Sequence, residues 1–280
     1  MTAVRHAFRL LTLCFGLLAA PAAMAAGPQP WELGFQQAVT PVMESITSLH
    51  NLLLVIIIAI CVFVLALLLY CIFRFRESSN PTPSKTTHHT VIEVIWTVVP
   101  VLILVVIAIP SFRLLYFSDV VPDADMTLNV TGRQWYWSYA YPDHGGFTFD
   151  SNMVPDDQLT EGQKRLLSVD NPVVVPVDTT VRVIISASDV LHSWAVPPFG
   201  LKTDAVPGRA NETWFRAEAE GIYYGQCSEL CGVNHGYMPI EVRVVSKDRF
   251  DAWLDQARQQ FADGGSAGGM QVATAPGTAE

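Results

Sequence analysis

Side chains that bind soft metals gather in one short segment near the C-terminal end of the chain. The segment 227–238 contains Cys227, Cys231, His235 and Met238. Thiolate and thioether sulfurs select copper, zinc or iron-sulfur clusters, and a Cys, His and Met set on one loop supplies most ligands of blue-copper electron-transfer sites. Such a site needs a second imidazole from an earlier strand. We predict His192, at the end of a strand-like run, for this role.

The spacing of the two cysteines decides which kind of site is expected. Two cysteines in an exported domain usually form a disulfide, which is the alternative for Cys227 and Cys231. One thiolate holds one copper ion, whereas two thiolates spaced Cys-x-x-x-Cys can both bridge a pair, leaving one histidine for each metal. The nearby His235 and Met238, together with the upstream His192, favour the copper pair.

The composition indicates a chain that is partly in a membrane and partly globular. Its 280 residues are 50% hydrophobic and carry a formal net charge of -9. That is too apolar for one ordinary soluble domain, and the second half is too charged to lie wholly in lipid. Residues 1–25 have a basic start, an apolar run and the small residues Ala23-Met24-Ala25, which is typical of a cleaved secretory signal. We therefore expect the mature chain to be exported.

Two apolar segments predict a transmembrane helical hairpin within residues 26–118. Residues 52–73 carry no charge and are long enough to cross a bilayer, and residues 91–115 form a second span. Basic residues in the loop between them predict that this loop is cytoplasmic and that both mature ends lie outside. Glu93 is ionisable at membrane depth, which marks a proton or ion route unless the side chain simply reaches the interface.

Residues 119–262 predict an all-β domain that ends in a short helix. β-branched and aromatic residues alternate in short runs separated by Pro, Gly and Asp, as in an antiparallel sandwich or barrel. The expected strands are 126–130, 135–141, 173–176, 180–186, 212–217, 221–224 and 239–245. Apolar residues at helical spacing predict an amphipathic helix over 248–261. The tail 263–280, rich in Gly, Ala and Thr, is expected to be disordered.

These motifs together resemble subunit II of cytochrome c oxidase, of the bacterial haem-copper type. The likeness covers the helical hairpin, the aromatic run 132–139, the segment 191–197 and the cysteine loop. It implies a cupredoxin-like domain in the periplasm, anchored in the inner membrane. It also implies that the chain accepts electrons from cytochrome c at a dinuclear copper centre, CuA, and passes them to haem in subunit I. Subunit I would then reduce dioxygen to water with proton pumping, and this chain would carry electron entry only.

The resemblance also assigns roles to individual residues. It implies that Cys227 and Cys231 bridge the coppers, with His192, His235, Met238 and the backbone carbonyl of Glu229 as further ligands. The Glu229 side chain would help to hold Mg or Mn at the contact with subunit I.

Further roles implied by the resemblance lie outside the copper loop. Trp135 would be the surface residue through which electrons enter, and Glu93 would lie at the entry of a proton channel. Asp170 and Asp189 match positions that face cytochrome c.

Other classes of function are also compatible with parts of the sequence. A membrane-tethered copper carrier or storage protein would need exposed, exchangeable ligands. A binding module stabilised by a disulfide would need no metal. Residues 119–263 hold 21 Asp and Glu against 11 Lys and Arg, which suits a basic partner but also suits solubility alone. Trp135, in turn, is also compatible with a packed strand residue.

Overall fold

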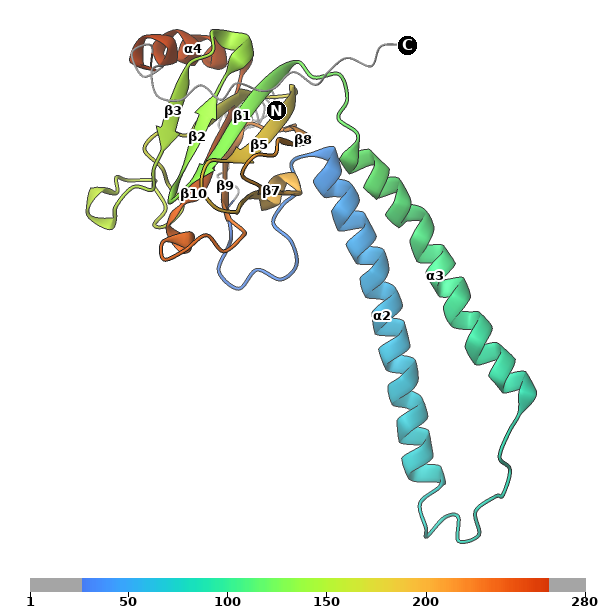
Figure 1. The fold of residues 1–280 in the computed structure, drawn as a ribbon. Helices are drawn as coiled ribbons and strands as arrows, with labels where there is room; N and C mark the ends of the chain where they lie inside the picture. Colours follow the sequence, from blue (N-terminus) through green and yellow to red (C-terminus); the bar gives the residue numbers. More distant parts are fainter. Residues whose placement is uncertain (1–26, 262–280) are drawn as a thin grey trace, which may run out of the picture.

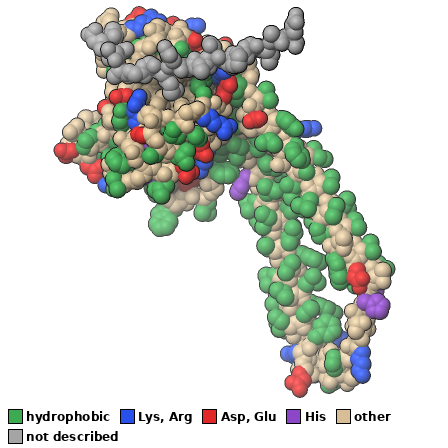
Figure 2. Space-filling view, viewed as in Figure 1, with side chains coloured by type: hydrophobic (Ala, Val, Ile, Leu, Met, Phe, Trp, Pro, Cys, Tyr) green, Lys and Arg blue, Asp and Glu red, His purple; other side chains and the backbone are tan. Residues whose placement is uncertain are grey.

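The computed structural model describes residues 27–261, in which two long helices extend from a β-sandwich (Figure 1). The predicted signal segment 1–25 and the predicted tail 263–280 lie outside the described residues. The helices are α2 (Pro41–Arg74) and α3 (Thr90–Asp119). Both are long and apolar enough to cross a membrane. Figure 2 shows hydrophobic side chains along both helices and charged ones at the loop that joins them.

Helix α2 is longer than the uncharged run 52–73, because its first turns belong to the β-domain. Thr40 caps the helix: its Oγ1 accepts a hydrogen bond from the Met43 amide at 3.1 Å and donates one to the Phe199 carbonyl at 2.8 Å. Val42 and Met43 in the first turn are buried. The membrane anchor is therefore joined to the sandwich by packing and hydrogen bonds as well as by the chain itself.

Two five-stranded sheets form the sandwich. The first has the order β3-β2-β1-β5-β8 and the second the order β4-β10-β9-β6-β7. The strands are β1 (Met126–Arg133), β2 (Tyr136–Ala140), β3 (Thr148–Ser151), β4 (Val173–Pro176), β5 (Thr180–Ala187), β6 (His192–Val196), β7 (Leu201–Ala205), β8 (Asn211–Arg216), β9 (Gly221–Cys227) and β10 (Pro239–Val245). In β1 every second residue is buried, as expected for a strand with one face on the core.

The structure differs from the expected antiparallel pattern in two strand pairs. β1 pairs with β5, and β10 with β4, in parallel. Each pair joins strands distant in sequence, so no local hairpin signal marks it. β3, β6 and β7 were also not expected as strands. All five residues of β6 are buried, which removes the alternation that would indicate a half-exposed strand.

Helix α4 (Lys247–Phe261) covers the end of the sandwich that lies away from α2 and α3 (Figure 1). Phe250, Leu254 and Ala257 are its buried face. Its Trp253 and Phe261 both pack on Phe149 of the first sheet, with Phe261 stacked on that ring at 4.9 Å between centroids. The opposite end of the sandwich is left free for the cysteine loop.

Candidate metal centre

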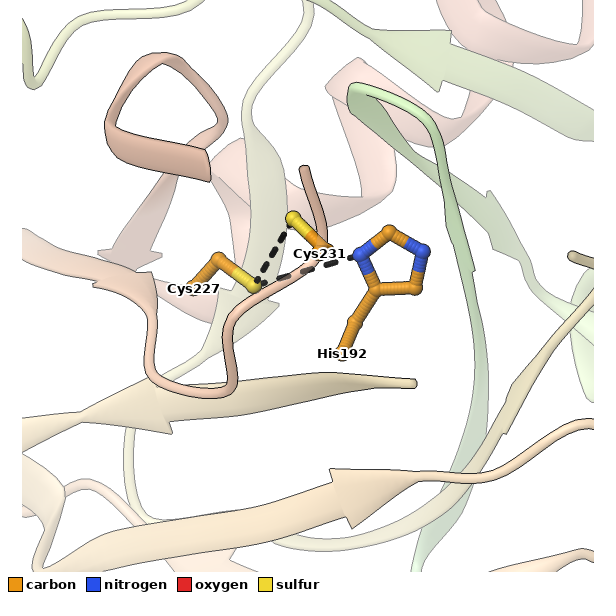
Figure 3. Close-up of side chains that lie close together, drawn as sticks. All are labelled: His192, Cys227 and Cys231. Carbon is orange, nitrogen blue, oxygen red and sulfur yellow. Dashed lines mark hydrogen bonds between the residues drawn. The ribbon is translucent and has the colours of Figure 1, made fainter. Parts of the chain in front are cut away.

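The two loop cysteines lie side by side as free thiols. Their Sγ atoms are 3.9 Å apart, far longer than the roughly 2.05 Å of a disulfide bond. Both residues are buried, and Figure 3 shows His192 beside them. A bond between a divalent metal and a thiolate is about 2.3 Å long, which exceeds half of the sulfur separation. An ion can therefore touch both sulfurs at once, and the geometry fits a shared pair of ligands.

Each sulfur has its own imidazole and its own weak donor. His192 Nδ1 lies 3.9 Å from Cys227 Sγ, and His235 Nδ1 lies 3.6 Å from Cys231 Sγ. The Glu229 carbonyl oxygen is 3.4 Å from Cys227 Sγ, while Met238 Sδ is 3.5 Å from Cys231 Sγ. Two thiols, two imidazole nitrogens, a thioether and a carbonyl thus converge on one place. This donor set suits soft, redox-active copper.

Strand pairing brings His192 to the cysteine loop. β6 and β9 are antiparallel neighbours in which Trp194 is opposite Cys227. His192 begins β6, so the expectation that it ends a strand was wrong; the preceding residues 188–190 form a bend. Gly132 of β1 makes room for the ring, since a Cβ there would lie 2.8 Å from His192 Cδ2.

A carboxylate orients the His192 ring. Its Nε2 is 2.9 Å from Asp189 Oδ1, which leaves Nδ1 turned towards the sulfur of Cys227. Burial lowers the pKa of His192, but the contacts with Cys227 and Asp189 outweigh it and raise the pKa overall. The Asp189 carboxylate also accepts the Gln134 and Val190 amides, at 2.7 and 2.6 Å. Asp189 therefore helps to hold the His192 ring in position.

The two thiols differ in acidity because they share one buried place. Burial raises the pKa of Cys227, yet hydrogen bonds from His192 and nearby backbone amides lower it to about 7 overall. Burial and the neighbouring Cys227 thiolate raise the pKa of Cys231 to about 12. Two negative charges this close oppose each other, so the second proton leaves only when a cation compensates it.

Trp135 lies directly against the cysteine loop. Its indole Nε1 donates to the Cys231 carbonyl at 3.1 Å, and Gln134 Nε2 donates to the same oxygen at 2.8 Å. Trp135 is half-buried, so part of the ring faces solvent. The ring also packs over Gly232, where a Cβ would come within 3.1 Å of it. One hydrogen bond thus joins a surface indole to the backbone of a candidate ligand.

The other predicted residues lie elsewhere. Glu93 is in the first turn of α3, at the end of the helical pair away from the sandwich, where its carboxylate accepts the His89 amide at 3.1 Å. The Glu229 side chain is exposed. The Asp170 carboxylate accepts the Asn152 and Asn171 amides, both at 2.7 Å, and so holds its own loop together.

Sequence reasoning missed the residues that support the ligands. Trp137 is fully buried, donates its Nε1 to the Met238 carbonyl at 3.2 Å and lies edge-on to His192. Gly132 and Gln134 fall within the aromatic run 132–139, for which the sequence predicted a role only at Trp135. The aromatic run marks a packed strand, but nothing in it tells which ring touches a metal ligand. A glycine within a strand was the one available sign of a close approach.

The fold and the site define a membrane-anchored β-sandwich protein with a cluster of sulfur and imidazole donors that could hold a metal. Known proteins agree with this class. The profile described as cytochrome c oxidase subunit II, periplasmic domain, matches residues 126–245, and the profile for the transmembrane domain matches residues 28–114. The chain therefore belongs to the cytochrome c oxidase subunit II family, as the resemblance predicted.

Two relatives of similar sequence support the same assignment. The probable cytochrome c oxidase subunit 2 of Rickettsia bellii is 51% identical over 255 residues, covering 91% of this chain and 95% of the relative. Cytochrome c oxidase subunit 2 of Oenothera berteroana is 50% identical, with coverage of 83% and 92%. Among solved structures, the periplasmic domain of subunit II from Bradyrhizobium japonicum is 54% identical, covers 51% of this chain and 99% of that chain, and has a TM-score of 0.48. The predicted fold class, a helical hairpin followed by a β-sandwich, is confirmed.

Proposed function

We propose that this chain is the electron-entry subunit of a cytochrome c oxidase complex. It would accept electrons from cytochrome c at a dinuclear copper centre and pass them to haem in subunit I, which would reduce dioxygen to water and pump protons. Membership of the family supports the complex and its subunit I. The observation that carries the copper pair is that two buried free thiols each have a separate imidazole.

Six groups would hold the copper pair. They are the side chains of Cys227, Cys231, His192, His235 and Met238 and the backbone carbonyl of Glu229. When bound, a copper pair supplies one-electron redox chemistry with little change in geometry. The sandwich holds the Cys227, Cys231, His192 and Met238 side chains away from solvent, and Asp189 keeps the His192 ring turned to the site. Such buried ligands argue against a carrier that must exchange its metal quickly.

Electron entry from cytochrome c would use Trp135. Its partly exposed indole and its hydrogen bond to the Cys231 carbonyl support this role. The docking partner would carry positive charge, because the β-domain is acidic. Lipid surrounds the two apolar helices. The Arg76 and Lys85 loop would lie in the cytoplasm and the β-domain in the periplasm, across a bacterial inner membrane.

The Glu229 side chain would serve a second metal. Its carbonyl faces Cys227 while its carboxylate is exposed, so the two groups can bind different ions. We assign the carboxylate to a Mg or Mn site completed by subunit I. Glu229→Ala should remove that ion from the purified complex and leave the copper content unchanged. A complex that retained the ion after this substitution would contradict the assignment.

Metal content and electron paramagnetic resonance of the purified complex test the main proposal. We expect two coppers in this chain that share one unpaired electron, because both sulfurs are within reach of both ions. A single copper, or thiols oxidised to a disulfide, would overturn the proposal. Rapid loss of the copper to a chelator would instead indicate a carrier or storage protein.

A further inference from the structure

A short loop before α2 exposes large apolar side chains beside the β-domain. In the segment 31–35, Trp31 is 98% exposed, Leu33 is 96% exposed and Phe35 is 46% exposed. A turn in which the Glu32 amide donates to the Gln29 carbonyl at 3.2 Å, followed by Gly34 at φ +90, shapes the tip of the loop. Large apolar side chains that are almost wholly exposed at a loop tip mark a contact surface.

The loop reaches the depth at which the membrane begins. The Phe35 ring packs edge-on against His50 of α2, with centroids 4.7 Å apart. His50 lies two residues before the uncharged run 52–73, which is about 3 Å along a helix axis. The loop tip is therefore level with the start of the apolar run. Figure 1 shows the segment descending from the sandwich beside α2, and Figure 2 shows apolar side chains at the same lower edge of the domain.

The loop is held in this position from its C-terminal side. The Val39 amide donates to the Pro198 carbonyl at 3.2 Å, and the Glu218 amide donates to the Val39 carbonyl at 2.9 Å. Thr40 then caps α2 on the domain. The segment consequently projects towards the membrane from a fixed base.

The chemistry of the loop suits the headgroup layer of a bilayer. Tryptophan is enriched at membrane interfaces, where its ring contacts acyl chains and its N–H stays among polar groups. The acidic residue of the tip, Glu32, accepts the Gln29 amide at 3.1 Å, so its carboxylate is turned back to the turn. The described residues 27–51 contain no Lys or Arg, so lipid contact here depends on apolar burial.

We propose that the loop 31–35 inserts Trp31 and Leu33 into the lipid headgroup layer on the side of the membrane that carries the β-domain. It forms a third membrane contact beside α2 and α3. Helices α2 and α3 meet the domain at one corner, where Thr40 and the buried Val42 and Met43 join α2 to the sandwich. A lipid contact away from that corner adds a second constraint on the height and tilt of the cysteine loop above the bilayer.

Photocrosslinking in native membranes tests this contact. Benzoylphenylalanine is introduced in place of Trp31 in the full chain within the assembled complex, and the irradiated subunit is weighed by mass spectrometry. A matched control places the same group at Gln259, exposed on α4 at the far end of the sandwich. We expect phospholipid adducts at position 31 and none at position 259.

Other outcomes would overturn the proposal. A crosslink from position 31 to another protein subunit would show that a protein covers the loop. No adduct at all from position 31, in a sample that retains its metal centre, would show that the loop lies in water. Equal lipid adducts at positions 31 and 259 would show that the loop has no preferential contact with lipid.

Discussion

Cys227 and Cys231 have the same side chain but different surroundings, and this difference gives the metal-free protein a pH dependence. The lowered pKa of Cys227 means that the folded state favours its thiolate, so this contribution to stability is present above the ordinary value of 9.0 and is lost as the pH falls through about 7. Cys231 contributes in the opposite direction, because its pKa is raised to about 12 and its ionisation at high pH therefore destabilises the folded state.

We therefore expect the free energy of unfolding of the reduced, metal-free chain to rise between about pH 7 and about pH 9 and to fall at higher pH. Urea unfolding followed by tryptophan fluorescence measures it. Cys227→Ser is the control, because it removes the thiolate that causes the rise. A free energy of unfolding that stayed constant from pH 7 to 9 would contradict the lowered pKa of Cys227.

Gly132 leaves the space that the His192 ring occupies in the candidate metal site. Gly132→Ala places a Cβ 2.8 Å from the His192 ring, and that ring is buried with no room to move. We expect a loss of about 1–3 kcal/mol of stability from overpacking and a loss of bound copper. Copper content and the visible spectrum measure the second effect.

Gly236→Ala is the matched control for Gly132→Ala. This glycine lies in the cysteine loop itself, yet a Cβ there would meet nothing within 4 Å. The Gly236→Ala variant should therefore keep the stability and the copper content of the unsubstituted chain. If Gly132→Ala also retained full copper, the close approach of Gly132 to His192 would not be important for the site.

Trp135 can be tested without disturbing the ligands. Trp135→Phe removes the indole N–H bonded to the Cys231 carbonyl, but Gln134 still donates to that oxygen at 2.8 Å. The copper spectrum should therefore stay intact while the oxidation of cytochrome c slows. Stopped-flow kinetics measures the rate, and an unchanged rate would exclude Trp135 from the electron path.

At the scale of elements, the start of α3 combines a structural and a proposed functional role. The Glu93 carboxylate accepts the His89 amide, and the His89 ring accepts the Ile92 amide at 3.4 Å. This reciprocal arrangement caps the helix whether or not Glu93 carries protons. Substitution by alanine alone therefore cannot separate the two roles.

Comparing Glu93→Gln with Glu93→Ala separates them. Glutamine keeps an oxygen that can accept the His89 amide but cannot ionise. If Glu93 lies at the entry of a proton channel, both variants should slow haem reduction during turnover with the copper centre unchanged. If glutamine restored the rate of the unsubstituted chain, the residue would be a helix cap only.

The boundaries of a helix or strand can be predicted from apolar periodicity where one of its faces is buried and the other is exposed. β1 and α4 have one buried face, and their apolar periodicity marks them in the sequence. β6 is buried throughout and short, so it has no periodicity. The first turns of α2 mix the apolar Val42 and Met43, buried on the sandwich, with polar residues, and hydropathy therefore finds only the uncharged run 52–73.

At the scale of the whole molecule, the acidic β-domain should govern the encounter with the electron donor. Several of its acids are paired internally, among them Glu241 with Arg243 and Asp156 with Arg165. The excess of 21 acidic over 11 basic residues in 119–263 nevertheless leaves a negative field.

We expect the rate of electron transfer from a basic cytochrome c to fall as ionic strength rises, because salt screens this field. Stopped-flow measurements over a series of salt concentrations test the trend. A small neutral reductant is the control, since its rate should not change. A donor rate independent of salt would mean that the acidic composition serves solubility alone.

The sequence by itself determined the candidate ligand types, the apolar spans and the alternating strands, because side-chain chemistry and hydrophobic periodicity depend only on residues that are close in the sequence. Cys227, Cys231, His235 and Met238 could be found together since one loop carries them. Only the tertiary structure decided that His192 begins a strand and meets Cys227, and that Gly132 makes room for its ring. These contacts join strands distant in the chain, and the energy that selects them comes from packing two sheets together, which no local pattern records.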